Sequence, residues 1–429
     1  MRPRVLSRFI PALTLLSTLA AEPTPEPTLS VAPAINALGL DLYRQQIKGA
    51  EGKGVLLSPY AIATALAMTY AGADGETKAE MHKVLHLPSD QAAGSTAFHD
   101  LAEQLAEMVR TSTAEATTVR KEGGEITAVQ LDVANRLFVQ RDYALRQDFL
   151  DDMHAHFAAS PESLDFKADP ELARKTINHW VAEQTHDKII GLLPEGQPTK
   201  DTRLTLVNAL YLRAPWEHKF EPEATELEAF RLRGGQSAPV PTMLSQRFYG
   251  YAKQPGYTVV TLPYWRGKLQ FVLIVPDRRD GLETVEKQLT IADLKEFTHL
   301  KDQLVQLHLP RFKLVPDSLS LGGTLQALGL KTAFDQPRGS ANFDRMASRR
   351  PDDYLYIGEV VHKTWLSLDE HGTEAAAATA VIMLSGFGVS AQPPTPIEVR
   401  ADHPFLFAIQ HVDSGVCLFL GRVTDPRAN

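Results

Sequence analysis

The stretch "DEHGTEAAAATAVIMLSGFGVSAQPPTP" occupies Asp369–Pro396, close to the C-terminal end of the 429-residue chain. From Ala375 to Ala391 it contains no charged residue and no proline. Alanine is the best helix former, so the run could form a short helix. It could also form a buried strand, because small side chains and free backbone amide groups fit between two strands of a sheet. Periodicity does not distinguish a fixed core strand from a segment that inserts later.

Composition limits the classes of partner. The chain carries 44 Lys and Arg against 52 Asp and Glu, a formal net charge of −8, with no concentrated block of either sign. We therefore expect neither nucleic acid nor an anionic membrane surface as a partner. The single cysteine, Cys417, excludes internal disulfides and cysteine-based metal clusters, and its apolar neighbours favour an inert buried thiol.

The N-terminal 21 residues have the layout of a secretory signal. Three arginines precede a short apolar stretch at residues 9–16, and small residues follow up to Ala21, where we expect cleavage. A retained membrane anchor is the weaker alternative, because the stretch is too short to span a bilayer. Residues 22–33, with "EPTPEPT", are predicted to be a Pro/Thr/Glu-rich linker, and residues 34–429 a single domain. A secreted or periplasmic location follows.

The order of predicted elements indicates an α+β fold. Apolar residues at helical spacing predict helices over Ile35–Ile47 and Ala61–Met68, the second capped by Ser58 and ended by Gly72 in the left-handed conformation. Strand-like runs follow at Leu131–Gln140, Leu204–Leu212, Leu269–Pro276, Gln303–Pro310 and Tyr354–Leu368, with a C-terminal hairpin that turns at Asp413–Gly415. A helical first third followed by many strands is typical of α+β proteins.

The sequence gives no support to an enzyme. It contains neither the G-x-S-x-G elbow of hydrolases nor an H-E-x-x-H zinc helix. The "HAH" at His154–His156 has the spacing of a strand face inside a helical pattern, so a metal site there is not expected. The Asp-Ser-Gly at Asp413–Gly415 suits a tight turn better than a nucleophile loop. We expect no catalytic residues, no metal and no cofactor.

Six blocks of sequence resemble the serpins, in the order in which that family has them. They are "SPYAIATALAMTYAGADGETKAEMHKVLHL" (Ser58–Leu87), "INHWVAEQTHDKIIGLLPEG" (Ile177–Gly196), "LTLVNALYLRAPWEHKF" (Leu204–Phe220), "LHLPRFKL" (Leu307–Leu314), "VVHKTWLSLDEHGTEAAAAT" (Val360–Thr379) and "HPFLFAIQHVDSGVCLFLGRVTDP" (His403–Pro426). We identify the chain as similar to a secreted, prokaryotic-type inhibitory serpin. The resemblance implies three β-sheets, about nine helices and an exposed reactive-centre loop.

The resemblance also implies a mechanism. In inhibitory serpins a protease attacks the loop and is acylated, and the freed loop then inserts as a new strand of the large sheet. The family's hinge matches Glu370, Gly372, Thr373, Glu374, Ala375, Ala376, Ala377, Ala378 and Thr379. Ser58, Asn208 and His362 match the polar cluster, or shutter, under the middle of the sheet. Ala61 departs from the family, where a serine is usual, which removes one hydrogen bond of roughly 1 kcal/mol.

The family's commonest loop length places the reactive bond at Gly386-Phe387, with Leu384 or Ser385 as alternatives on the acyl side. No Lys or Arg occurs from Thr364 to Val399, so chymotrypsin-, elastase- or subtilisin-like proteases are expected rather than trypsin-like ones. Cysteine proteases are an outside candidate. A non-inhibitory serpin acting as a carrier or chaperone is the alternative. We expect a monomer without heparin binding, because the stretch His99–Glu115 is acidic.

Overall fold

The computed structural model describes residues 30–50, 52–88, 91–350, 353–374 and 395–427. The predicted signal peptide, the reactive bond and its alternatives, and the hinge from Ala375 to Thr379 lie outside the described residues. Among the described helices, none is long and apolar enough to cross a membrane.

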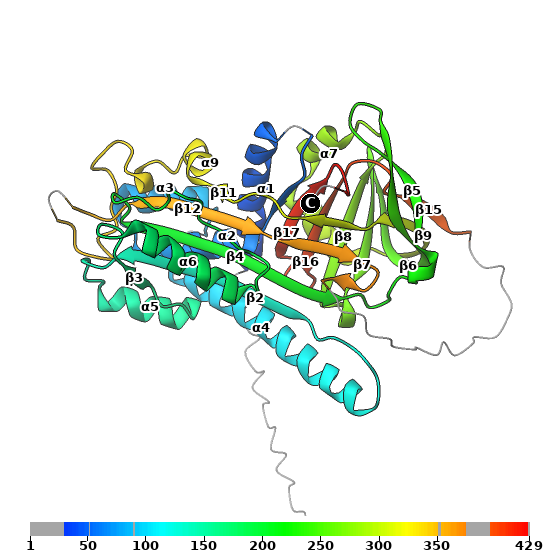
Figure 1. Ribbon diagram of the computed structural model, residues 1–429, viewed down its shortest axis with the longest axis horizontal. Coiled ribbons are helices and arrows are strands. Elements are labelled where there is room, and N and C mark those ends of the chain that lie inside the picture. The colour runs from blue at the N-terminus through cyan, green and yellow to red at the C-terminus, as the bar shows by residue number, and fades with distance from the viewer. Residues whose placement is uncertain (1–29, 51, 89–90, 351–352, 375–394, 428–429) are drawn as a thin grey trace, which may run out of the picture.

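Nine α-helices occur in these residues (Figure 1), in agreement with the expected number. They are α1 (Ala32–Gly49), α2 (Pro59–Gly72), α3 (Gly75–Val84), α4 (Gln91–Lys121), α5 (Gln147–Phe157), α6 (Pro170–Gln184), α7 (Leu282–Gln288), α8 (Ile291–Glu296) and α9 (Gly322–Ala327). Since α1 begins at Ala32, the last two residues that we assigned to the linker are helical.

The strands form two hydrogen-bonded sheets. Their bounds are β1 (Val55–Leu57), β2 (Gln130–Gln140), β3 (Glu162–Leu164), β4 (Leu204–Pro215), β5 (Glu226–Arg231), β6 (Ser237–Gln254), β7 (Tyr257–Pro263), β8 (Leu269–Pro276), β9 (Asp302–Pro310), β10 (Phe312–Leu314), β11 (Leu319–Ser320), β12 (Ile357–Thr364), β13 (Leu366–Asp369), β14 (Gly372–Thr373), β15 (Ile397–Arg400), β16 (Phe405–His411) and β17 (Cys417–Val423). All five predicted strand regions are present, and Trp365 separates β12 from β13.

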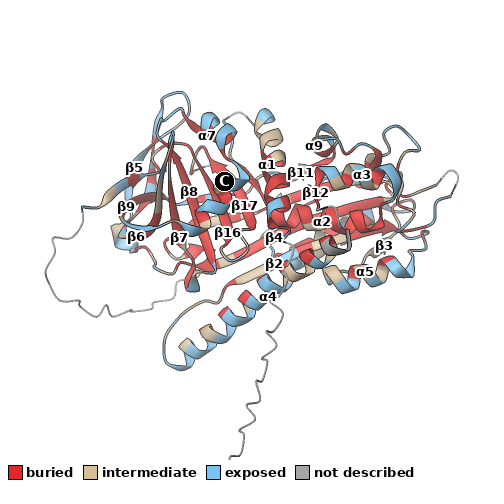
Figure 2. Ribbon diagram, turned by 180° about the vertical axis from the view of Figure 1, so that it is seen from behind, coloured by how far each residue is buried: buried red, intermediate tan, exposed pale blue. Residues whose placement is uncertain are grey.

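One sheet has the order β10-β13-β14-β4-β12-β11, with β2 beside β4 and β3 beside β2; we call it the large sheet, and it is built around β4. It pairs antiparallel with β2 on one side, and on the other side parallel with β12 and, at its end, antiparallel with β14. Helix α6 packs on one face through Ile177 and Val181, against a cluster that includes Phe138 and Val207. Helix α2 contacts the same strands and belongs to the main core. The sheet is therefore covered by helices on both faces, and Figure 2 shows its strands largely buried.

The second sheet has the order β1-β17-β16-β8-β7-β6-β9-β15, with β5 beside β6. Its long strand β6 pairs with β5 and β9 over residues 237–250 and with β7 over residues 250–254. Because β6 changes partners along its length, this sheet has two parts. Together with the large sheet they give the expected three-sheet α+β fold.

The predicted cap of α2 is correct and its predicted end is not. Ser58 Oγ accepts a hydrogen bond from the Ala61 amide at 3.2 Å. Gly72 is the last helical residue, followed by an extended Ala73, and does not adopt the left-handed conformation. A Cβ on Gly72 would lie 2.8 Å from Met346, so close packing explains this glycine.

Candidate functional site

The first hinge residues already form part of the large sheet. Gly372 and Thr373, which make up β14, lie opposite Pro215 and Ala214 of β4 and opposite Asp369 and Leu368 of β13. The chain thus turns back after β13 and enters between β13 and β4. The side chain of Thr373 is buried, and its hydroxyl is 2.5 Å from the Tyr264 hydroxyl.

Gly372 is required by space and by backbone conformation. Its φ of +142° lies in a region that residues with a Cβ rarely adopt, and a Cβ would lie 2.1 Å from the Ala214 carbonyl oxygen. The backbone of β4 therefore approaches Gly372 as closely as glycine permits.

Glu370 fixes the turn that precedes β14. Its carboxylate is buried and accepts hydrogen bonds from Arg311 Nε and Thr225 Oγ1, each at 2.5 Å. Burial opposes ionisation of this carboxyl, but the hydrogen bonds from Thr225 and Arg311 outweigh it, so the pKa of Glu370 is lowered. A charge-assisted contact thus holds the base of the hinge.

Trp216 is a hinge contact that the sequence reasoning missed. Its indole donates to the Asp369 carbonyl at 2.9 Å, its backbone amide donates to the His371 carbonyl at 2.9 Å, and its ring stacks on Tyr264 at 4.5 Å. Trp216 stands directly after β4 in the quoted block "LTLVNALYLRAPWEHKF". Its position beside a strand end was the only signal available in the sequence.

Glu374 marks the point where the chain leaves the sheet. Its amide still donates to the Ser367 carbonyl at 3.0 Å, but its φ is +45°. Its carboxylate pairs with Lys188 Nζ at 2.6 Å, and Lys188 lies 5.0 Å from the centre of the Trp365 ring. Lys188 belongs to the segment that follows α6, so this segment contacts the hinge.

The three predicted shutter residues meet in the fully buried middle of the large sheet. His362 Nε2 accepts a hydrogen bond from the Ser58 amide at 3.1 Å, and its Nδ1 contacts Asn208 Oδ1. The acceptor role of Nε2 assigns the proton to Nδ1 of a neutral imidazole. Burial lowers the pKa of His362 to about 3, so the ring is neutral at physiological pH. These contacts join β12 to β4 and to α2.

Asn135 of β2 is a fourth member of this cluster that was not predicted. It lies opposite Asn208, and its Nδ2 donates to the Ala61 carbonyl at 3.2 Å. Within the described residues its Oδ1 has no hydrogen-bond partner. Ala61, where the family usually has serine, therefore lies beside an unused acceptor.

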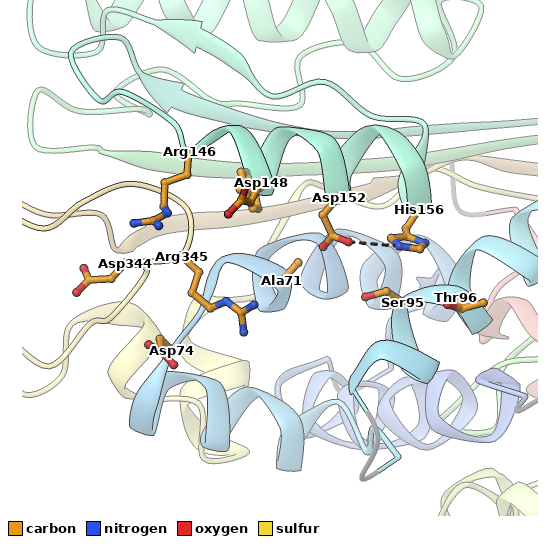
Figure 3. Close-up of a pocket in the computed structure, with 11 residues that line it drawn as sticks. Ala71, Asp74, Ser95, Thr96, Arg146, Asp148, Asp152, His156, Asp344 and Arg345 are labelled. Atoms are coloured by element: carbon orange, nitrogen blue, oxygen red, sulfur yellow. Dashed lines mark ion pairs between the residues drawn. The ribbon is translucent and has the colours of Figure 1, made fainter.

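One cavity lies away from the hinge and the shutter. It has a volume of about 860 Å³ and is lined mainly from α4, α5 and the segment around Arg345 (Figure 3). His156 and Asp152 in its wall are 3.4 Å apart.

Comparisons with known proteins agree with the resemblance to the serpins. Residues 33–426 match the family model described as "Serpin (serine protease inhibitor)". Human serpin B10 is 34% identical over 406 residues, covering 92% of this chain and 100% of the relative. The horse leukocyte elastase inhibitor is 35% identical over 398 residues, covering 90% and 97%. Both relatives are mammalian and give no support to the expected prokaryotic type.

A solved structure gives the same result for the fold. Uncleaved ovalbumin superimposes with a TM-score of 0.77 at 25% identity, covering 93% of this chain and 100% of the other. The matched family and the similar leukocyte elastase inhibitor are named as inhibitors of proteases and not as catalysts, so the protein is not an enzyme. On its sequence and its fold, the chain belongs to the serpin family.

Proposed function

We propose that this serpin traps proteases as a suicide substrate, with loop cleavage followed by insertion of the hinge between β4 and β12. The observation that carries the proposal is β14. Gly372 and Thr373 already pair on both sides as residues of a central strand would, before any cleavage. Insertion then extends an existing strand and needs no new nucleus.

The pairing of β14 fixes the register of that extension. Continuing one residue at a time along β4 brings Thr379 opposite Asn208, and continuing along β13 into β12 brings the same Thr379 opposite His362. Asn208 and His362 face each other now. The registers extended along β4 and along β12 therefore place the same residue between Asn208 and His362. An inserted Thr379 would separate this shutter pair and offer it a hydroxyl group.

The side-chain pattern suits this register. Side chains of a strand alternate between the two faces of a sheet, and Thr373 faces the main core. Thr373 is placed on that face by its contact with Tyr264 of the main core, so Thr379, six residues on, would point to the face where Ser58 lies. Ala376, Ala378 and Ala380 would point to the face covered by α6, where small side chains let a strand enter under a packed helix.

The same register supports a position for the reactive bond. The gap between the strands ends at Leu204 and Ile357, the first residues of β4 and β12, and these would lie opposite Met383 and Leu384. A strand that fills the gap thus runs to Leu384. This supports a bond at Gly386-Phe387, with Ser385 or Leu384 as the alternative acyl-side residues.

The loop composition supports a class of target. With no Lys or Arg between Thr364 and Val399, a protease with an acidic specificity pocket finds no cationic side chain. We propose chymotrypsin-, elastase- or subtilisin-like serine proteases, and the name of the similar leukocyte elastase inhibitor agrees with this class. Cysteine proteases are a secondary target class.

Secretion and the absence of a heparin effect are also proposals. Secretion is supported by the signal-like layout of residues 1–21. On α4, Arg110 bonds to Glu107 at 2.9 Å and to Glu103 at 3.3 Å, which leaves this arginine committed to carboxylates. We propose that the protein acts as a monomer.

The test is incubation with chymotrypsin, elastase, subtilisin and trypsin, followed by denaturing gel electrophoresis. We expect a denaturation-resistant complex with at least one of the first three and none with trypsin. Mass analysis of the released C-terminal peptide locates the bond, which we expect directly after Gly386. Cleavage by all three non-tryptic proteases without any complex would refute the inhibitory function.

A further inference from the structure

At the end of the large sheet far from β14, a cluster of polar side chains joins the segment before β12 to the segments around β2 and β4. We call it the distal clasp; it consists of Asp353, Tyr143, Lys167 and Arg203. Asp353 accepts from the Tyr143 hydroxyl at 2.7 Å, from Lys167 Nζ at 2.9 Å and from Arg203 Nε at 2.9 Å.

The contacts of Asp353 cross the boundary between β4 and β12. Asp353 lies four residues before the start of β12. Tyr143 follows β2, Lys167 follows β3, and Arg203 directly precedes β4. A further bond crosses the same boundary, since the Tyr356 hydroxyl donates to the Asp201 carbonyl at 2.7 Å. The clasp thus joins the two halves of the sheet that an inserted strand must separate.

The side chains of the clasp are shielded enough from solvent for their charges to contribute to stability. The side chain of Arg203 is 17% exposed and that of Asp353 is 28% exposed. Burial opposes ionisation of Asp353, but hydrogen bonds from Tyr143, Lys167 and Arg203 outweigh it and hold its pKa well below the usual range. Several partly buried charge-assisted bonds on one carboxylate form a network, which stabilises more than an isolated surface pair.

Insertion is incompatible with the present geometry of the clasp. Neighbouring strands lie about 4.8 Å apart, so a new strand between β4 and β12 moves them apart by roughly that distance. Contacts of 2.7 to 2.9 Å across the boundary cannot all survive such a movement. We propose that the distal clasp stabilises the uncleaved state selectively and is released in the last stage of insertion. This inference rests on the proposed function.

The test compares melting temperatures of the uncleaved and loop-cleaved protein. Thermolysin is used for cleavage, because a zinc protease forms no acyl-enzyme and is not trapped. We expect Asp353→Asn to lower the melting temperature of the uncleaved form by about 3 °C and to leave that of the cleaved form unchanged.

Asp165→Asn is the matched control. Asp165 also pairs with an arginine, Arg141 at 2.9 Å, and accepts from Gln140 at 3.1 Å, but both partners lie on the β2 side of the boundary. Asp165→Asn should lower the melting temperatures of the uncleaved and cleaved forms equally. If Asp353→Asn also lowers the melting temperatures of both forms equally, while cleavage still stabilises the wild type, the proposed role of the clasp is refuted and insertion is not. If cleavage does not stabilise the wild type, insertion itself is refuted, and the clasp with it.

A second pair of variants, each of which removes only one hydroxyl group, serves if Asp353→Asn does not fold. Tyr143→Phe removes one 2.7 Å hydroxyl bond to Asp353, and Tyr43→Phe removes a bond of the same length to Glu286, which lies in α7 and outside the large sheet. We expect Tyr143→Phe to destabilise only the uncleaved form and Tyr43→Phe to destabilise both. If Tyr143→Phe lowers the melting temperatures of the uncleaved and cleaved forms equally, the proposal is overturned.

Discussion

The end of β4 at Pro215 and its middle at Asn208 differ in what lies beside them. At Pro215 a third strand, β14, already separates β4 from β13. At Asn208 the strand pairs directly with His362 of β12. We call the end at Pro215 the open end, because β4 is separated there from its neighbour by β14, and the part at Asn208 the closed middle, because β4 pairs there directly with β12. The change occurs at Glu374, where the chain leaves the sheet. In the proposed mechanism, insertion begins at the open end, and the closed middle sets the resistance that the inserting strand meets.

The two regions are also held by different chemistry. The open end relies on a buried carboxylate, Glu370, with an arginine partner, and on a hydroxyl pair between Thr373 and Tyr264. The closed middle relies on a neutral histidine and amides. Neutral hydrogen bonds cost less to exchange than charged ones, so the middle would be able to open and close again during the proposed insertion.

The largest effect is expected from a charge at the open end. Thr373→Arg places a cation at a position that is 1% exposed, between β13 and β4. We expect the variant to be cleaved by the target protease without forming complex, a loss of at least about tenfold in complex yield, since burying an unpaired charge costs several kcal/mol. Complex yield is measured on denaturing gels against cleaved product.

Thr373→Ser is the control for this variant, because it keeps the hydroxyl beside Tyr264. It should retain most of the complex yield. Undiminished trapping by Thr373→Arg would show that the open end does not take part in insertion.

The second effect concerns the pH dependence of the closed middle. The unfolded histidine binds a proton below about pH 6.5, whereas His362 in the fold does so only near pH 3. Between these values the unfolded state binds more protons, so stability falls as pH falls, by about 1.4 kcal/mol per pH unit. We expect the melting temperature of the uncleaved protein to drop between pH 6.5 and pH 5.

The variant His362→Gln isolates this contribution, because every other titrating group remains. Its melting temperature should depend less on pH over the same range than that of the wild type. Identical slopes for the two proteins would rule out His362 as the source of the acid sensitivity.

The smallest effect is expected at Ala61. A serine hydroxyl there could donate to the unused Oδ1 of Asn135 and add about 1 kcal/mol to the stability of the closed middle. We expect Ala61→Ser to raise the melting temperature of the uncleaved form by about 1 °C. Ala63→Ser, also buried on α2, is a control that should give no gain. A lower melting temperature for Ala61→Ser would contradict the hydrogen-bond interpretation.

The sequence predicted the elements better than their contacts. Strand and helix patterns gave the α+β fold, and family blocks identified Gly372, Ser58, Asn208 and His362. The pairing of β14 was not predictable, because it depends on how two distant strand ends, at Pro215 and Asp369, come together. Trp216 and Asn135 were missed for the same reason, since their roles come from contacts far along the chain.

The most direct test of the central claim is a crystal structure of the loop-cleaved protein. We predict that β4 and β12 no longer pair, and that Thr379 lies between Asn208 and His362 with its side chain toward Ser58. A cleaved structure in which Asn208 and His362 still face each other, or in which another loop residue lies between them, would contradict the account.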